Sequence, residues 1–277
     1  MKLYCFQKII CIDFLLNTLI ILFTVASDGM VYVNVYNRLQ VETLEIFASR
    51  VSKNIKKNSQ SWEKEISFVF LQFINALKYL QAQGIEEISS SSLQYFLLIR
   101  DDKDPHYRIV MLEDHIRNTS SEKNEVLSLC SVGLAALLLL FRWENPIQTV
   151  ISHTSSQRIN LPEFTPSVGM FSTMCELLER SSSMALGQVK SMLEYMLWGP
   201  NDIAFEFIEE HKREEELQRW LDLERATVLN NLIRTKGWLC NIELAVFEEY
   251  HLLFLVQTCA KMLHEASMLF ESEVSCM

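Results

Sequence analysis

The chain has 277 residues, carries a formal net charge of −10 at pH 7, and is 49% hydrophobic and 22% charged. This length suffices for one large domain or two small ones with a substantial core, and the composition excludes a chain that is disordered as a whole. The negative charge argues against nucleic acid and anionic lipid as main partners. Only 7 glycines and 5 prolines occur, which favours long helices with few turns.

The 7 cysteines are scattered, without a C-x-x-C pair and without histidine at zinc spacing. A free cysteine on an apolar helix face behaves as a small hydrophobic residue, so the pattern indicates a reducing compartment and predicts no metal and no cofactor. The cysteines are Cys5, Cys11, Cys130, Cys175, Cys240, Cys259 and Cys276.

Residues 1–29 form an apolar N-terminal segment that admits two interpretations. Ile9–Val25 is nearly apolar between a basic start and a small-residue sequence, which is the pattern of a secretory signal peptide. It is short for a membrane span and contains Asp13 and Asn17. A secreted chain would also offer Asn118 for glycosylation. The alternative is a start unrelated to the fold, which we favour because nothing downstream suggests secretion.

The first half of the remaining chain predicts a strand, two helices and a hairpin. Met30–Tyr36 is rich in β-branched and aromatic residues and predicts the strand. Helical spacing of apolar residues predicts helices over Val41–Ile55 and Ile66–Gln83, the second largely buried. Tyr95–Ile99 and Tyr107–Leu112 are apolar stretches on either side of a polar connection, and they predict the hairpin.

The second half predicts helices almost throughout. Val126–Phe141 is very hydrophobic, and its length suits a core helix better than a membrane span. Residues 144–167 contain three prolines and are expected to be irregular. From Phe171 the pattern is helical to the end, with breaks at Ser181–Ser183 and Trp198–Pro200.

The segment from Gln83 to Leu98 has the frame of a protein-kinase catalytic loop without its chemistry. A kinase carries His-Arg-Asp in this loop and an Asn five residues after the Asp; on that spacing the Asp position is Ser89 and the Asn position is Gln94. The Asp accepts or orients the proton of the substrate hydroxyl, and the Asn holds a magnesium ion. Because serine carries no charge, this alignment predicts a chain that transfers no phosphate.

Further segments resemble the PEAK/Pragmin family of pseudokinases. Val110–Ile116 is similar to the strand before the metal-binding Asp-Phe-Gly, with Asp114 at the Asp position. Cys130–Leu134 resembles the start of the central C-lobe helix, whose capping Asp falls at Ser128. Three later segments resemble the helices that follow the C-lobe in that family: Met192–Pro200, Leu217–Ala226 and Phe247–Leu255.

The resemblance implies a mainly α fold. Residues 30–190 would form a protein-kinase-like C-lobe with a small β-hairpin, and residues 191–277 a helical dimerisation extension. The sequence departs from the family because most of the N-lobe is missing. Only Gly29 and Gly84 precede Ser89, so no glycine-rich phosphate loop can form.

The polar residues in and near the loop from Gln83 to Leu98 are not expected to form a catalytic site. Asp114 is better explained as an ordinary loop carboxylate than as a residual magnesium ligand, because no phosphate loop accompanies it. Gln94 is one methylene longer than Asn and receives little weight. Glu86 and Glu87 are adjacent acids, which on a loop usually face water.

The histidines also favour structural roles. His153 lies near two serines, but no G-x-S-x-G elbow accompanies it. His251 and His264 are expected on the last helix, in a core or an interface.

The C-terminal helices carry the pattern that is most informative for binding. One apolar stripe lies on a helix whose other face is charged, and the last helix, from Phe247 to Leu269, is apolar on more than one face. Burial within the chain and a dimer interface explain this pattern equally well, and the resemblance favours the interface. The predicted interface residues are Leu217, Trp220, Leu221, Val228, Phe247, Tyr250 and Phe254.

The sequence therefore predicts a catalytically inactive pseudokinase scaffold that forms a homodimer, or a heterodimer with a related pseudokinase. By resemblance it would assemble signalling adaptors and tyrosine kinases linked to the cytoskeleton and cell migration, in the cytoplasm or at focal adhesions, without nucleic acid or membrane partners. Two alternatives remain open: a degenerate protein kinase that still binds ATP, and a secreted or membrane-anchored helical protein.

Overall fold

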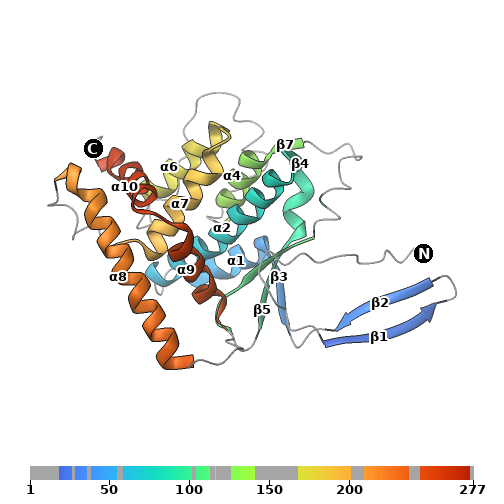
Figure 1. Ribbon diagram of the computed structural model, residues 1–277. Coiled ribbons are helices and arrows are strands. Elements are labelled where there is room, and N and C mark those ends of the chain that lie inside the picture. Colours follow the sequence, from blue (N-terminus) through green and yellow to red (C-terminus); the bar gives the residue numbers. More distant parts are fainter. Residues whose placement is uncertain are drawn as a thin grey trace. The chain divides into compact units, whose positions relative to one another are not determined.

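The computed structural model describes residues 19–26, 29–35, 39–54, 59–101, 104–112, 116, 126–140, 168–200, 209–236 and 244–274. The chain divides into two compact units: unit 1 comprises residues 1–58 and 72–157, and unit 2 comprises residues 59–71 and 158–277. Helix α2 (Ser59–Ala82) contributes to both. The described part is mainly helical with small antiparallel sheets, as expected (Figure 1). The predicted domain boundaries at residues 29 and 190 stay predictions.

A β-hairpin opens the described part of unit 1. Strand β1 (Leu19–Ala26) pairs antiparallel with β2 (Gly29–Val35), and Ala26 lies opposite Gly29. The strand expected at Met30–Tyr36 is thus confirmed as β2. Strand β1 was not predicted, because periodicity alone does not separate a short apolar strand from other apolar segments. The structure places this strand within the stretch that has the signal-like pattern.

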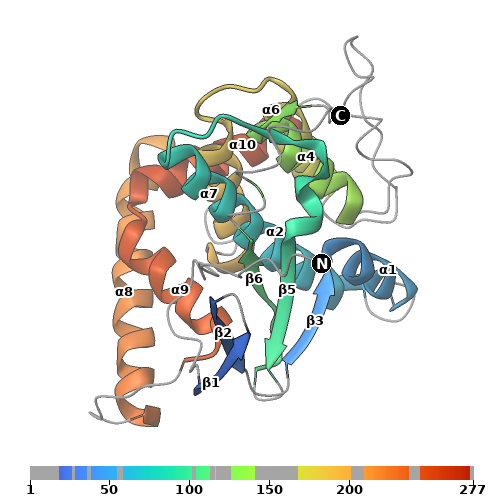
Figure 2. The same ribbon diagram turned by 90° about the vertical axis from the view of Figure 1, so that its right-hand side faces the viewer.

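The central sheet of unit 1 contains the predicted hairpin and one further strand. Its order is β3 (Leu39–Thr43), β5 (Phe96–Asp101) and β6 (Arg108–Met111), all antiparallel (Figure 2). Because residues 41–43 belong to β3, helix α1 (Leu44–Asn54) begins later than its predicted start at Val41. The β-branched residues before it pair with β5, and the Thr43 Oγ1 accepts the backbone N–H of Ile46 at 3.3 Å, as a helix-capping side chain does.

A second pair of short strands frames the loop that resembles a catalytic loop. Strand β4 (Glu87–Ser89) pairs antiparallel with β7 (Val126–Ser128), and the 3₁₀ helix η1 (Ser90–Tyr95) leads into β5. Helix α4 (Leu129–Leu140) then begins three residues later than predicted, because residues 126–128 belong to β7. Its side chains are buried almost all round, as expected for a core helix.

Within unit 1, the buried side chain of Gln72 connects α2 to the backbone at β6. The Gln72 Nε2 donates to the Tyr107 carbonyl oxygen at 2.8 Å, and the Gln72 Oε1 accepts the N–H of Ile109 at 2.9 Å. One bond goes to Ile109 in β6 and the other to Tyr107, the residue directly before β6; β6 is an outer strand of this sheet, with β5 on its other side. The side-chain amide of Gln72 therefore pairs with β6 as a residue of a neighbouring strand would. Gly84, with φ 78°, ends α2.

Unit 2 contains the C-terminal helices. They are α6 (Val168–Glu179), α7 (Ala185–Trp198), α8 (Glu210–Lys236), α9 (Val246–Gln257) and α10 (Ala260–Val274). Helix α10 packs against α6, α7 and α8 (Figure 1). Among the ranges described, no helix combines the length and the apolar character needed to cross a bilayer.

The predicted breaks in the C-terminal region are confirmed, and one was missed. Helix α6 ends before Ser181–Ser183, and α7 ends at Trp198. A Cβ atom on Gly199 would collide with the carbonyl oxygen of Tyr195, so this position requires glycine. The single last helix predicted from Phe247 to Leu269 is wrong, because α9 and α10 are separate helices with Thr258 and Cys259 between them.

We expect Gln72→Leu to lower the free energy of unfolding by about 2–4 kcal/mol. The change leaves the Tyr107 carbonyl oxygen and the Ile109 N–H, both in buried residues, without this partner, and each such loss costs roughly 1–3 kcal/mol. Urea denaturation followed by circular dichroism measures the effect. Lys64→Met, at an exposed position of the same helix, should change the free energy by less than about 0.5 kcal/mol. Equal denaturation midpoints for the two variants would contradict the assigned role of Gln72.

Candidate functional site

Ser89 occupies a structural position at the end of β4. It is only 4% exposed. Its Oγ accepts the backbone N–H of Ser91 at 3.4 Å and lies 3.0 Å from the Ser91 Oγ, so it caps the helix η1. A buried hydroxyl in this role has no negative charge with which to attract the proton of a substrate hydroxyl.

The other predicted catalytic positions do not complete a site. Gln94 lies on η1 and is exposed, and Asp114 falls outside the described residues. Glu86 and Glu87 face solvent, as expected for adjacent loop acids. Within the described ranges, no three His, Cys, Asp or Glu side chains gather as a group that could hold a metal ion.

The loop frame is instead held by backbone pairing to the start of α4. Glu87 lies opposite Ser128 in the β4–β7 ladder, and the N–H of Leu129 donates to the Glu86 carbonyl oxygen at 3.1 Å. The Ser128 Oγ accepts the N–H of Ser131 at 3.1 Å, which is the capping role expected at this position. Two serines thus cap helices at the positions where the kinase alignment places carboxylates.

An aromatic cluster joins α2, α7 and α9 within unit 2. The ring of Phe68 on α2 meets three others edge-on or nearly so: Phe247 at 4.9 Å, Tyr250 at 5.4 Å and Trp198 at 6.3 Å between centroids. The Trp198 ring also lies 5.7 Å from that of Phe254. Aromatic pairs at such separations stabilise a core beyond the area that they bury. We call these five residues the aromatic cluster.

Most of the predicted interface residues contribute to the core of unit 2. Leu217, Leu221, Tyr250 and Phe254 are buried, with Leu221 at 0% and Phe254 at 1% exposure. Trp220, Val228 and Phe247 are half-buried. The structure brings Phe247, Tyr250 and Phe254 together through the aromatic cluster. Their role in a dimer stays a prediction.

The exposed apolar side chains of α8 and α9 are different residues. Leu223 and Leu229 on α8 are 68% and 59% exposed, and Leu253 and Val256 on α9 are 45% and 79% exposed. We call these four the exposed apolar set. Leu253 and Val256 belong to the stretch that the sequence analysis describes as apolar on more than one face, although they were not among the predicted interface residues. Leu223 and Leu229 were missed because they lie outside the strongest helical stripe of α8.

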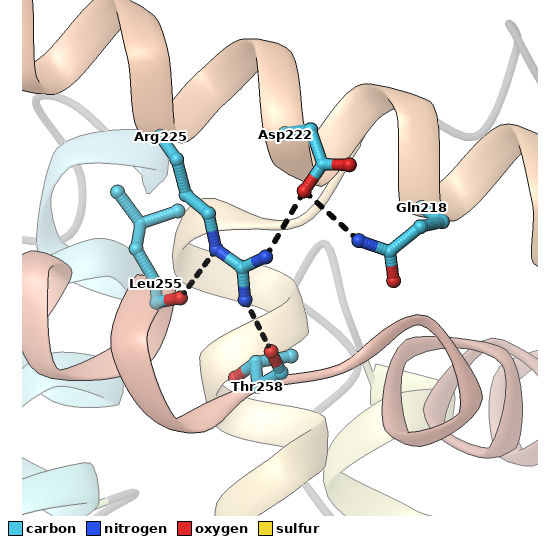
Figure 3. A network of polar contacts seen from close by, with 5 residues as sticks. All are labelled: Gln218, Asp222, Arg225, Leu255 and Thr258. Carbon is cyan, nitrogen blue, oxygen red and sulfur yellow. Dashed lines mark hydrogen bonds and ion pairs between the residues drawn. The ribbon is translucent and has the colours of Figure 1, made fainter.

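A polar network links α8 to the end of α9. The Arg225 Nε donates to the Leu255 carbonyl oxygen, and its Nη2 donates to the Thr258 carbonyl oxygen, both at 2.8 Å. Its Nη1 lies 3.1 Å from the Asp222 Oδ1, which in turn accepts the Nε2 of Gln218 at 2.9 Å (Figure 3). A guanidinium at the C-terminal end of a helix is favoured by the free carbonyls and by the helix dipole.

His251 is half-buried beside the aromatic cluster. Its ring stacks on Trp198 with centroids 5.5 Å apart and 10° between the planes, and its Nε2 lies 3.9 Å from the Glu224 Oε1. Burial lowers the pKa of His251 below 6.5, and the Glu224 carboxylate opposes that shift. His264 lies on α10, so the two histidines are on different helices, and His153 is outside the described residues.

Comparison with known proteins identifies the fold class. No protein-family model matches the sequence, and no curated protein matches it. Among solved structures, the chain is similar to a crystal structure of the pseudokinase PEAK1 (Sugen Kinase 269), with a TM-score of 0.62 and 14% sequence identity. The match covers 82% of this chain and 65% of that chain, slightly less than two thirds of the neighbour.

This similarity shows the fold alone. The chain is a mainly α protein with a protein-kinase-like fold.

We expect His251 to make the fold less stable as the pH falls. The folded state holds the pKa of His251 below its ordinary value of 6.5, so the unfolded chain binds a proton first as the pH drops through that value. The stability that neutral His251 provides is therefore complete above the ordinary pKa and is lost as the pH falls through the folded pKa. Thermal unfolding from about pH 8 to about pH 5 measures this loss.

His251→Phe serves as the matched variant, because phenylalanine keeps a ring against Trp198 and cannot be protonated. Its melting temperature should fall less with pH than that of the unchanged protein. Glu224→Gln removes the opposing carboxylate and should steepen the decline. Parallel pH profiles for the unchanged protein and His251→Phe would show that His251 does not titrate in this way.

Proposed function

We propose that this chain is a catalytically inactive, kinase-like protein that acts by binding other proteins. The observation that carries the proposal is Ser89, a buried hydroxyl that caps η1. The sequence alignment with a kinase catalytic loop puts Ser89 where phosphoryl transfer needs a carboxylate. The similarity to a pseudokinase structure supports it.

The proposed binding activity is dimerisation through the C-terminal helices, with a second copy or with a related pseudokinase. The resemblance of residues 192–200, 217–226 and 247–255 to the PEAK/Pragmin family supports this choice. The exposed apolar set on α8 and α9 is the surface that we assign to the contact, because apolar side chains at this exposure gain from being covered. The buried residues of the aromatic cluster would support that surface from beneath.

The proposal extends to cellular partners by the same resemblance. The dimer would assemble signalling adaptors and tyrosine kinases in processes linked to the cytoskeleton and cell migration, in the cytoplasm. Dimerisation would place two copies of any bound partner together and so raise their effective concentration.

We expect the purified chain to bind no nucleotide and to transfer no phosphate. Thermal unfolding with ATP and Mg²⁺ should give the same melting temperature as Mg²⁺ alone, because a ligand raises that temperature only by binding the folded state. Incubation with labelled ATP and a general protein substrate should give no label above background. A rise of several degrees would favour the degenerate kinase that still binds ATP, and transfer of label would overturn the proposal.

We expect Leu223→Glu to weaken the dimer about tenfold or more while leaving the fold intact. Leu223 is exposed in the single chain, so a charge is tolerated there, but it would have to lose water in an interface. Analytical ultracentrifugation at micromolar concentrations gives the dissociation constant. Phe254 is unsuitable for this experiment, because a charge at a buried position would unfold unit 2.

Met184→Glu is the matched control for this experiment. Met184 is 70% exposed in unit 2 and lies outside the exposed apolar set. This variant should dimerise as the unchanged chain does. A monomeric mass for the unchanged chain at tens of micromolar would sink the dimer proposal, and an equal effect of both substitutions would remove the assignment to α8 and α9.

A further inference from the structure

Strand β3 is an outer strand of the central sheet of unit 1. The sheet order is β3–β5–β6, and within the described ranges no strand lies on the other side of β3 (Figure 2). The Val41 side chain in the middle of β3 is 56% exposed, and Ile46 in the first turn of α1 is equally exposed. An outer strand of this kind can pair with a strand of another chain.

The side-chain bond of Gln72 shows which backbone groups of this sheet face outward. In an antiparallel ladder, successive residues of a strand direct their N–H and C=O groups to opposite sides. The N–H of Ile109 donates to Gln72, so Arg108 is the residue that faces β5, where it lies opposite Ile99. Ile99 therefore faces β6. Val41 lies opposite Ile99 in β3, so the N–H and C=O of Val41 face away from the sheet.

Strand β3 lacks the features that usually protect an outer strand. Its sequence, L-Q-V-E-T, contains neither lysine nor proline. Its one charge is engaged, because the Glu42 Oε1 accepts the Arg50 Nη2 at 3.0 Å and the Glu42 side chain is only 12% exposed. The opposite edge of the sheet differs, since Gln72 bonds to backbone groups at the start of the outer edge of β6. The edge of β3 is therefore the one that can accept a further strand.

The sequence of β3 is complementary to itself in the antiparallel direction. When Val41 lies opposite Val41 of a second copy, Gln40 lies opposite Glu42 of that copy, and no two carboxylates face each other. The Gln40 Oε1 accepts the Arg100 Nη2, which leaves its side-chain NH₂ group to donate to a carboxylate. In this register the two Val41 residues exchange backbone hydrogen bonds. Gln40 and Glu42 form the more closely spaced type of pair, in which side chains approach most closely.

We propose that β3 pairs with β3 of a second copy about a two-fold axis at Val41, so that two three-stranded sheets become one. Such a pairing is closed, because it uses the open edge of each copy and Gln72 blocks the start of the other edge. A stable interface buries about 1,200–2,000 Å² in total, and one short strand buries less, so this association is weak. It does not depend on the dimer proposed for α8 and α9, and a chain with both contacts forms assemblies larger than a pair.

Sedimentation of the full chain carrying Leu223→Glu tests this pairing without the helical contact. We expect the average mass to rise toward that of a pair between about 20 µM and about 500 µM, as for a weak contact. Val41→Pro in the same background should stay monomeric. Proline removes only an N–H that faces away from β5, and outer strands tolerate it, so the fold is kept. A monomeric mass for Leu223→Glu at the highest concentration, or equal association with Val41→Pro, overturns the proposal.

Opposite charges at position 41 test the two-fold register. Val41→Lys brings like charges together at the axis, and Val41→Glu does the same, so each variant alone should be monomeric. An equimolar mixture of the two, both with Leu223→Glu, should associate, because lysine then lies opposite glutamate. A mixture that associates no better than either variant alone rules this register out. Val41→Thr stays β-branched and uncharged, and as the matched control it should associate within about threefold of the Leu223→Glu chain.

Amide hydrogen exchange in the Leu223→Glu chain locates the contact. The N–H of Val41 should exchange about twofold more slowly when half of the molecules are paired, because pairing supplies its acceptor. The N–H groups of Gln40 and Glu42 face β5 in the single chain, so their exchange should depend less on concentration. Association without slowing at Val41 overturns the assignment to β3. Failure of the helical dimer would leave these results unchanged, because all of them are measured with Leu223→Glu.

Discussion

Every side chain of α2 from Ile66 to Ile74 is buried, and this enclosure is the constraint on which the rest of the structure depends. A helix segment whose side chains are buried on every face must be covered on all sides. In unit 2, Phe68 provides the centre of the aromatic cluster. In unit 1, Phe73 packs on Phe96 with ring centroids 4.6 Å apart, and Gln72 binds β6. The C-terminal helices of unit 2 and the β3–β5–β6 sheet of unit 1 thus both depend on the buried helix α2.

The loop that resembles a catalytic loop keeps its frame while its polar groups serve the backbone. Ser89 caps η1, Ser128 caps α4, and the β4–β7 ladder connects the two. These hydrogen bonds use uncharged hydroxyl groups of modest polarity. Burying such groups costs little free energy once they are hydrogen-bonded. An aspartate there would have to be paired or neutralised. In this chain the described loop therefore serves to hold η1 and α4.

The sequence allowed the long elements to be predicted and left the tertiary details undetermined. Helix α2 and the β5–β6 hairpin carry strong periodicity or clear polar connections, and both were found. The strands β3 and β7 directly precede helices, so their residues were absorbed into helical patterns. For the candidate site, spacing placed Ser89 and Gln94 in the loop. The sequence pattern could not distinguish buried Leu221 from exposed Leu223, because the burial of each residue depends on which face of α8 is covered by α9 and α10.

The pairing of Gln72 with β6 has a consequence for association between molecules. An outer strand with free backbone groups can recruit a strand of another chain, and such growth leads to aggregation. Here the Gln72 amide already bonds to the Tyr107 carbonyl oxygen and the Ile109 N–H, two backbone groups at the start of the outer edge of β6. One side chain from a helix thereby blocks the start of this edge against pairing with a strand of another chain.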